Sequence, residues 1–338
     1  MRKFTTKLLL CCLLVCSLFV SQPETAKADT INGIQPILPV QYQKLLGKGM
    51  DVDWSKTKKG QETFHKTIVK DFKNAGINHV RIRVKDNVSQ DLFYHLDEQI
   101  RACLEAGIIP IIAYQANGYM MAEWHFYASG PSKENERKLW TTGTEKEKNL
   151  IRNKIQLALE WQKKTGIPTW VGAWMAGNYN DGDDYSVKEQ VIFAHFMVSE
   201  LKKAGIPFAV NADTHFYDRE NKTWIKKMLP LRYCIFSSYG QAVKALFTDS
   251  ANKISKITKR SSSSAVVEWT KLTWAKKYKV EISTSKAFKN KKVYTVTGNK
   301  KTLSNLKKGT SYYVRVKGCY VSNGKNVYSK YSSIKVIK

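Results

Sequence analysis

The sequence has few cysteines, and their placement excludes a disulfide-stapled fold. Three of the six lie within the first 16 residues, and the other three, Cys103, Cys234 and Cys319, are far apart. A sparse, odd set of this kind provides no disulfide framework. It favours buried thiols that fill core space over a metal-binding or catalytic role.

Motifs of several common chemistries are also absent. The sequence contains no Gly-x-Ser-x-Gly, Cys-x-x-Cys or His-Glu-x-x-His pattern and no glycine loop of the phosphate-binding type. The acid-rich stretch 177–185 lacks the closing glutamate of an EF-hand loop and favours an ordinary turn. We therefore expect neither a metal nor a cofactor.

Beyond the first twenty residues there is no long apolar run, so no membrane span is expected. The chain begins Met-Arg-Lys, continues with an apolar run at 8–20 and reaches Ala-Lys-Ala at 26–28. This order of basic, apolar and small residues predicts a signal peptide over 1–28. The mature protein is then secreted, either extracellular or associated with the cell wall.

Acidic residues are scarce in the last quarter of the chain. Residues 251–338 hold 22 Lys and Arg against two Glu, whereas residues 29–250 hold 30 against 25 Asp and Glu. A basic exported module attracts anionic polymers, such as wall teichoic acids or acidic polysaccharide, in a salt-sensitive way. The export signal argues against nucleic acid. Solubility without any partner explains the same charge equally well.

Residues 29–250 alternate short apolar segments with amphipathic ones, which predicts an α/β fold with parallel strands. Strands are expected at 46–54, 79–84, 108–115, 119–127, 169–174 and 207–213. Helices are expected at 62–75, 91–106, 145–164 and 186–204, with a fifth after Trp224. The alternation breaks once, where only residues 116–118 separate two strands. Neighbouring parallel strands need a longer crossover, so we expect a hairpin or an irregular junction there.

Residues 251–338 have a different texture, with short alternating strands and no helical spacing, which is typical of an all-β sandwich. The run Leu306, Gly309, Thr310 and Tyr312 resembles the tyrosine corner of fibronectin type III domains, and Trp269 stands where that family buries a core tryptophan. The resemblance implies an immunoglobulin-like fold for this segment.

Three segments of the first region resemble glycoside hydrolase family 5, the cellulase-like family. GINHVRIRV at 76–84 resembles its second strand, and Arg81 matches the arginine of that strand. His125 and Tyr127 resemble the His-x-Tyr of its sixth strand, and 166–174 resembles its seventh. The resemblance covers 45–235 and implies a (β/α) TIM barrel, with Arg81, His125 and Tyr127 in a cleft for β-glycan.

The same comparison shows two departures. The family's nucleophilic glutamate is replaced by Ala173, and the Asn-Glu pair that carries its acid/base is missing. The fourth and fifth strands are absent between Gly118 and Tyr119, so the barrel is expected to be incomplete. We expect its third and sixth strands to pair across the short link, leaving exposed strand edges.

Other carboxylates are candidates for the chemistry, because a glycosidase uses two of them. Asp53 and Asp213 end the first and last strands and are expected to be neighbours at the rim, with Asp51 nearby and Glu123 close to His125. The alternative is structural: Asp53 caps a turn, Asp213 binds backbone and Glu123 orients a neighbour.

An aromatic ring at the site would bind the face of a sugar, and Trp174, at the end of a strand, is the best candidate. Most of the other rings are expected to belong to the core.

The sequence therefore predicts a secreted, family 5-like glycoside hydrolase that acts on β-glycans, with the basic β-sandwich as a spacer or surface anchor. The alternative is a catalytically inactive carbohydrate- or wall-binding protein that keeps Arg81, His125 and Tyr127 without the acids. Whether the chain is an enzyme stays open at this point.

Overall fold

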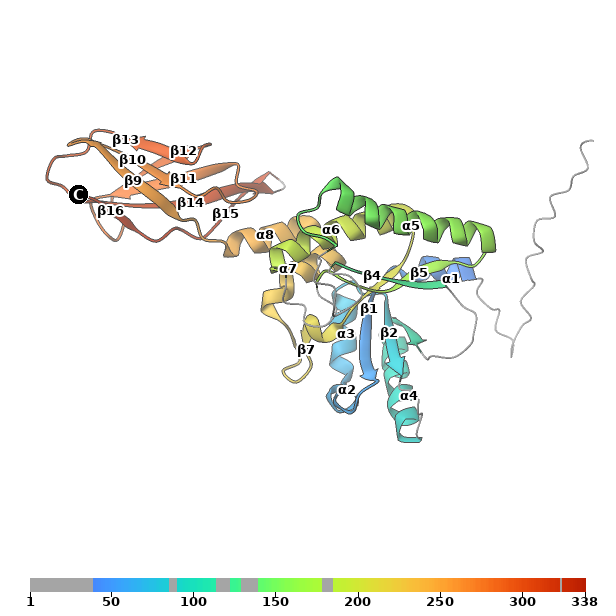
Figure 1. The fold of residues 1–338 in the computed structure, drawn as a ribbon. Coiled ribbons are helices and arrows are strands. Elements are labelled where there is room, and N and C mark those ends of the chain that lie inside the picture. Colours follow the sequence, from blue (N-terminus) through green and yellow to red (C-terminus); the bar gives the residue numbers. More distant parts are fainter. Residues whose placement is uncertain (1–38, 85–89, 114–121, 129–138, 178–184, 323) are drawn as a thin grey trace, which may run out of the picture.

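The structure is a computed structural model that describes residues 39–84, 90–113, 122–128, 139–177, 185–322 and 324–338. It contains an α/β region and a β-sandwich, joined through helix α8 (Tyr239–Asp249) (Figure 1). The expected signal peptide over 1–28 lies outside the described residues. No helix within the described ranges is long and apolar enough to cross a membrane.

The α/β region is built on a parallel sheet of six strands. They are β1 (Lys48–Ser55), β2 (His79–Val84), β3 (Ile109–Ala113), β4 (Ala122–Tyr127), β5 (Thr169–Met175) and β6 (Phe208–Val210). Their order across the sheet is β3-β2-β1-β6-β5-β4. The sheet is strongly twisted, so that β4 and β5 run across the direction of β1 and β2 (Figure 1).

The strand order confirms the predicted parallel α/β fold and corrects one pairing. We expected the strands at 108–115 and 119–127 to pair, but β3 and β4 form the two opposite edges of the sheet. Within the described residues, the six strands therefore form an open sheet rather than a closed barrel. The short link at 114–121 lies outside the described residues.

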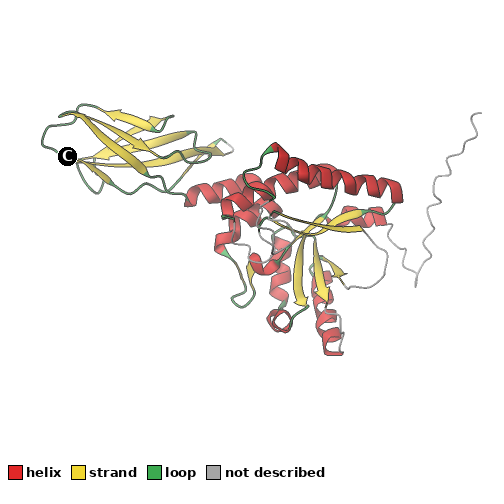
Figure 2. Ribbon diagram, in the orientation of Figure 1, coloured by secondary structure: helices red, strands yellow, loops and turns green. Residues whose placement is uncertain are grey.

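Helices cover the sheet on its apolar side (Figure 2). They are α1 (Pro39–Leu46), α2 (Lys58–Thr63), α3 (Lys66–Asn74), α4 (Gln90–Glu105), α5 (Glu145–Thr165), α6 (Val187–Ala204), α7 (Leu229–Arg232) and α8, with a short hairpin of β7 (Tyr217–Asp218) and β8 (Thr223–Trp224). The two long helices α5 and α6 begin at capping boxes, Thr144 with Glu147 and Ser186 with Glu189. The helix expected over 62–75 is divided at 64–65 into α2 and α3.

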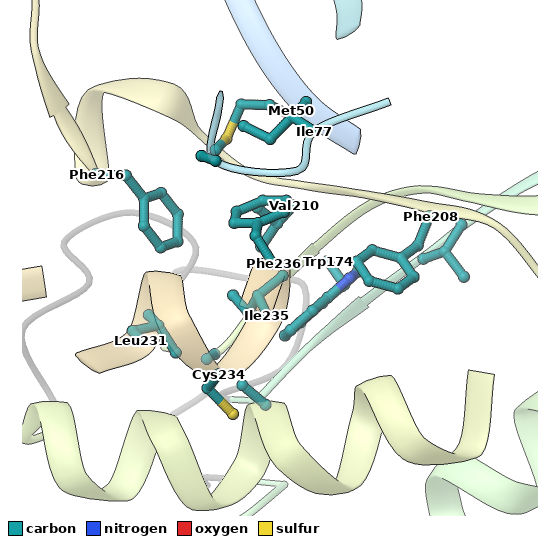
Figure 3. Packing of buried hydrophobic residues seen from close by; sticks show 14 of the residues in the cluster. Met50, Ile77, Trp174, Phe208, Val210, Phe216, Leu231, Cys234, Ile235 and Phe236 are labelled. Carbon is teal, nitrogen blue, oxygen red and sulfur yellow. The ribbon is translucent and has the colours of Figure 1, made fainter. Parts of the chain in front are cut away.

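Alternate residues of each strand face the helices and form the core. On β1 these are Met50, Val52 and Trp54, all fully buried. Figure 3 shows part of this core, where Trp174 of β5 and Phe208 of β6 lie above α6. Because the apolar residues fill this side, the polar residues at the intervening positions lie on the other face of the sheet.

The β-sandwich consists of two antiparallel sheets. One holds β9 (Ile254–Ser261), β10 (Ser264–Trp269) and β13 (Lys300–Leu303), and the other β11 (Lys277–Ser283), β12 (Lys292–Val296), β14 (Tyr312–Ser322), β15 (Lys325–Tyr328) and β16 (Lys335–Ile337). Trp269 is fully buried between them. The hydroxyl of Tyr312 accepts a hydrogen bond from the Lys307 amide at 3.0 Å, which closes the expected tyrosine corner.

The junction between the two regions is packed rather than open. Phe247 of α8 is 1% exposed, and its ring lies against Gly318 and the ring of Tyr320. The amide of Lys330 donates to the carbonyl of Ser250 at 2.9 Å. These contacts hold the sandwich against the end of α8.

Candidate functional site

The polar face of the sheet carries a cleft at the carboxyl ends of its strands. Its volume is about 580 Å³, within the range of about 300–1,000 Å³ that is typical of small-molecule sites. It is lined by Asp51, Lys56, Arg81, Arg83, His125, Phe126, Tyr127, Leu139, Lys154, Ala173 and Asn211. The sequence-based candidates Arg81, His125 and Tyr127 therefore line the same cleft.

Arg81 is at the centre of the site and is bound to two carboxylates. Its Nη1 lies 3.0 Å from Asp51 Oδ1 on the neighbouring strand β1, and its Nη2 lies 2.9 Å from Glu123 Oε1 on β4. Asp51 and Arg81 are register partners in the parallel pair of β1 and β2, which fixes the first contact. The second contact spans the concave face between strands that are not neighbours in the sheet.

Two further groups extend this network. His125 Nε2 lies 2.6 Å from Glu123 Oε1, the same oxygen that contacts Arg81. Arg83 Nε lies 3.4 Å from Asp51 Oδ2. The guanidinium of Arg83 gives Asp51 a second cationic neighbour. The result is one continuous chain of contacts that runs from His125 through Glu123, Arg81 and Asp51 to Arg83.

The environment shifts the pKa values of Asp51 and Glu123 in opposite directions. Burial raises the pKa of Asp51, which is 2% exposed, against the opposing effects of Arg83 and Arg81. Burial also acts to raise the pKa of Glu123, but the hydrogen bond with His125 and the charge of Arg81 outweigh it, so this pKa is lowered. Of the two, Glu123 is therefore the carboxylate whose ionised form its neighbours stabilise.

Glu123 reaches this position because a glycine lies beneath it. A Cβ built on Gly172 of β5 would lie 2.0 Å from Cδ of Glu123, far inside any allowed contact. Only glycine therefore leaves space for the carboxylate to cross the neighbouring strand toward Arg81. The next residue, Ala173, lines the cleft and is 2% exposed. Its methyl group offers no reactive atom to the cleft.

The expected rim pair, Asp53 and Asp213, is found in a separate network. Arg219 binds both: its Nε donates to Asp213 Oδ2 at 2.9 Å and its Nη2 contacts Asp53 Oδ1. Trp54 Nε1 also donates to Asp213 Oδ2, at 3.0 Å. Asp213 is fully buried, and Asp53 lines a second hollow of about 520 Å³ next to Arg219. These two acids are thus neighbours, but they line no part of the cleft that Arg81 and His125 line.

The prediction that Trp174 forms a sugar platform is wrong. Its side chain is fully buried and packs on Phe193 and Phe208 at centroid distances of 5.9 and 5.6 Å, on the helix side of the sheet. Tyr127 is 6% exposed, lines the cleft and meets the ring of His125 edge to face at 6.1 Å. The imidazole of His125, 43% exposed, is the ring of this pair that is open to a ligand.

Several site residues had no signal in the sequence. Lys56 follows β1, Lys154 lies on α5 and Asn211 follows β6, so they reach the cleft from three distant parts of the chain. Asn211 is 8% exposed, and its Oδ1 has no hydrogen-bond partner among the described residues. Arg219 belongs to the hairpin after β6, a segment without any recognised motif.

A metal centre finds no support in the described part of the chain, where no three His, Cys, Asp or Glu side chains are grouped for metal binding. The buried cysteines are isolated, and burial raises the pKa of both Cys103 and Cys234 to about 12. Such thiols stay protonated and unreactive at neutral pH.

Comparison with known proteins identifies the C-terminal region. Residues 253–335 match the model of the fibronectin type III domain, so the sandwich is a domain of this type. A solved Fn3-like protein from Clostridium thermocellum is 25% identical, with a TM-score of 0.21, and the alignment covers 25% of this chain and 86% of that one.

For the α/β region the comparison is more distant. A structure named as an endoglucanase is 13% identical, with a TM-score of 0.48, over 60% of this chain and 100% of its own. Similarity at this level carries no information about activity. None of the curated proteins compared matches this sequence.

Proposed function

We propose that the α/β region is a cellulase-like glycan-binding domain, which holds a β-glycan chain in the cleft without cleaving it. One observation carries the proposal: Asp51 and Glu123 are both bound to the guanidinium of Arg81. The site thus keeps the binding groups of the glycoside hydrolase family 5 pattern, while its carboxylates are committed to an ion-pair network.

The strand order supports the barrel ancestry in this proposal. In an eight-stranded barrel, the first strand lies between the second and the eighth. Here β1 lies between β2 and β6, and β5 and β4 follow on the same side. This is the order expected if β4, β5 and β6 correspond to the sixth, seventh and eighth strands of a barrel that lacks its fourth and fifth.

Hydrolysis is disfavoured by what each carboxylate already does. A glycosidase needs one carboxyl group to protonate the leaving oxygen and a second to attack or to activate water. Asp51 is 2% exposed between two arginines, and Glu123 is held ionised by His125 and Arg81. Neither is a free acid facing the cleft, and the nucleophile position carries the methyl group of Ala173.

The lining nevertheless suits a saccharide, whose hydroxyls both donate and accept hydrogen bonds. Lys56, Arg83 and Lys154 supply donors around the cleft. The unpartnered Oδ1 of Asn211 supplies a buried acceptor, and such an atom is costly unless something binds it. A sugar hydroxyl pointing at Asn211 satisfies this atom, which makes it a direct marker of ligand binding.

Oligosaccharide binding tests the proposal. We expect cellohexaose, xylohexaose or a mixed-linkage β-glucan oligosaccharide to give a measurable Kd by isothermal titration calorimetry with the whole chain. His125→Ala removes the exposed imidazole and should weaken binding at least about tenfold. His95→Ala, on the outer helix α4, is the matched control and should leave Kd unchanged. If no β-glycan binds, the proposal is wrong.

A second candidate, hydrolysis, is favoured by the opposed pKa shifts of the two carboxylates. A raised pKa suits a proton donor and a lowered one suits a nucleophile, so Asp51 and Glu123 have the polarity of an acid and base pair. Glu123→Gln separates the candidates. If Glu123 is the nucleophile, the substitution should abolish sugar release. If the domain only binds, neither the natural chain nor the variant should release sugar.

Secretion belongs to the same proposal, since a β-glycan of the cell wall or of plant material is met outside the cell. We expect the protein in the culture medium or the wall fraction, with Asp29 as its first residue. N-terminal sequencing of the exported protein checks this, and an intact Met1 in the cytoplasmic fraction alone would contradict it.

A further inference from the structure

The outer face of the larger sandwich sheet carries a cluster of cations and tyrosine rings. We call the set of Lys279, Lys317, Arg315, Tyr328 and Tyr331 the cationic sheet face. Lys317 Nζ lies 4.4 Å from the ring centroids of both tyrosines, and Lys279 Nζ lies 4.9 Å from that of Tyr328. The Arg315 guanidinium lies 3.9 Å from the ring of Tyr331. Aromatic rings therefore space the cations and hold them in place.

Two lysines of this face lie directly opposite each other. Lys279 on β11 is the register partner of Lys317 on β14. Like charges at such a position destabilise a sheet. The pKa of Lys317 is lowered by burial and by the charge of Lys279, against the opposing charge of Glu281. The pKa of Lys279 is raised, chiefly by a hydrogen bond with Tyr328. A bound anion between the two ammonium groups would relieve this repulsion.

The carboxylate of Glu281, next to this face, already has partners at both of its oxygens. Glu281 is 3% exposed, and it accepts hydrogen bonds from Arg315 at 2.7 and 2.9 Å and from the Tyr331 hydroxyl at 2.7 Å. Lys291 Nζ lies 3.0 Å from Oε1 of Glu281, the same oxygen that accepts from Tyr331. Glu281 thus neutralises Arg315 and Lys291. Within the described residues, neither Lys279 nor Lys317 has a carboxylate partner.

We propose that the cationic sheet face binds a phosphodiester-linked polyol polymer, of the teichoic acid type, with Lys279 and Lys317 bracketing a phosphate. The inference goes beyond the glycan cleft and does not depend on it. It gives the basic character of 251–338 a place of contact at Lys279 and Lys317.

The chemistry of the free cations favours phosphate over carboxylate. The planar fork of arginine matches a carboxylate, and Arg315 already holds one in Glu281. The groups left over are two compact ammonium ions with rotatable donors, which act on a phosphate as point charges. A phosphate with several acceptor oxygens can contact both ammonium groups at once, and a polymer presents the next phosphate to neighbouring lysines of the domain.

A charge-neutralising pair of substitutions tests the proposal. With the whole chain and purified polyglycerol phosphate in 0.15 M salt, Lys279→Gln with Lys317→Gln should weaken binding about tenfold. It should also reduce the slope of log K against log salt by about 1.5. The control Lys256→Gln with Lys259→Gln removes the same charge from exposed positions of β9 in the other sheet and should change Kd less than twofold.

Further variants and polymers make the test decisive. Lys317→Glu should weaken binding more than Lys317→Gln, and Lys279→Arg with Lys317→Arg should retain most of it. An equal loss in the β9 control would overturn the proposal, because it would show attraction by net charge alone. So would equal or tighter binding of polygalacturonate, which points to carboxylates, or of a single-stranded DNA oligonucleotide, which points to nucleic acid.

Discussion

The α/β region and the fibronectin type III domain differ in where their charged residues lie. In the α/β region, charges on the concave face are buried in closed networks: Arg81 binds Asp51 and Glu123, and Arg219 binds Asp53 and Asp213. In the fibronectin type III domain, the core is apolar and the cations stand outside. The first arrangement fixes the shape of a cleft, and the second leaves charge available to a partner.

This difference predicts where the molecule is vulnerable. A buried ion pair that loses one partner leaves a charge without compensation, whereas an exposed lysine is screened by water and salt. The stability of the α/β region should therefore be sensitive to single charge substitutions and to pH. Substitution of exposed lysines in the sandwich should change the affinity for a ligand more than the stability.

The largest effect is expected from Asp213→Ala. It removes the fully buried carboxylate that Arg219 and Trp54 bind, so the free energy of unfolding of the α/β region should fall by about 3 kcal/mol or more. Urea denaturation measures this. The exposed Asp97→Ala on α4 is the control and should cost less than about 1 kcal/mol. Equal effects of the two changes would contradict a buried network.

As pH falls, the α/β region should lose stability before the sandwich does. Burial lowers the pKa of His79 to about 4, while a hydrogen bond with the Leu46 carbonyl opposes the shift. The unfolded chain then binds the proton more readily, so this stability is fully present above about pH 6.5 and is lost as pH falls toward 4. The expected loss at pH 4.5 is roughly 2 to 3 kcal/mol.

Scanning calorimetry at pH 7 and at pH 4.5 checks this difference between the regions. The transition of the α/β region should move to lower temperature, while that of the sandwich, which contains no histidine, should move less. A larger shift of the sandwich transition would reverse the comparison.

Glu281→Gln should affect stability and binding in opposite directions. It releases Arg315 and Lys291 from their carboxylate, so the sandwich should lose roughly 2 kcal/mol of stability. The added positive charge on the cationic sheet face should at the same time tighten binding of polyglycerol phosphate. Thermal melting and titration of one sample measure both effects, and a loss of affinity would argue against this face as the binding surface.

Periodicity predicted most of the fold, because each element buries one regular face. The strand over 79–84 and the helices α5 and α6, with their serine or threonine caps and terminal glycines, lie within one residue of the expected bounds. The link between β3 and β4 was misjudged, since few residues between two strands suggested direct pairing. The pairing of β6 with both β1 and β5 places β3 and β4 at opposite edges.

The sequence predicts which residues share a face on strands where polar and apolar residues alternate. It does not predict this on strands where they do not alternate. On β4, Glu123, His125 and Tyr127 alternate with core residues, so their common face was predicted. On β5 all seven residues are buried, so the pattern did not distinguish the cleft side from the helix side, and Trp174 was placed wrongly. Lys154 and Arg219 come from distant segments and reach their sites only through the tertiary fold.

The most direct test of the binding assignment is a reducing-end assay on a sample that binds glycan. The whole chain, at a concentration that saturates a β-glycan oligosaccharide, is incubated with it for many hours next to the Glu123→Gln variant. We predict that binding is measurable and that no reducing ends appear above the level of the variant. Release of sugar by the natural chain that Glu123→Gln abolishes would contradict this assignment and identify a working hydrolase.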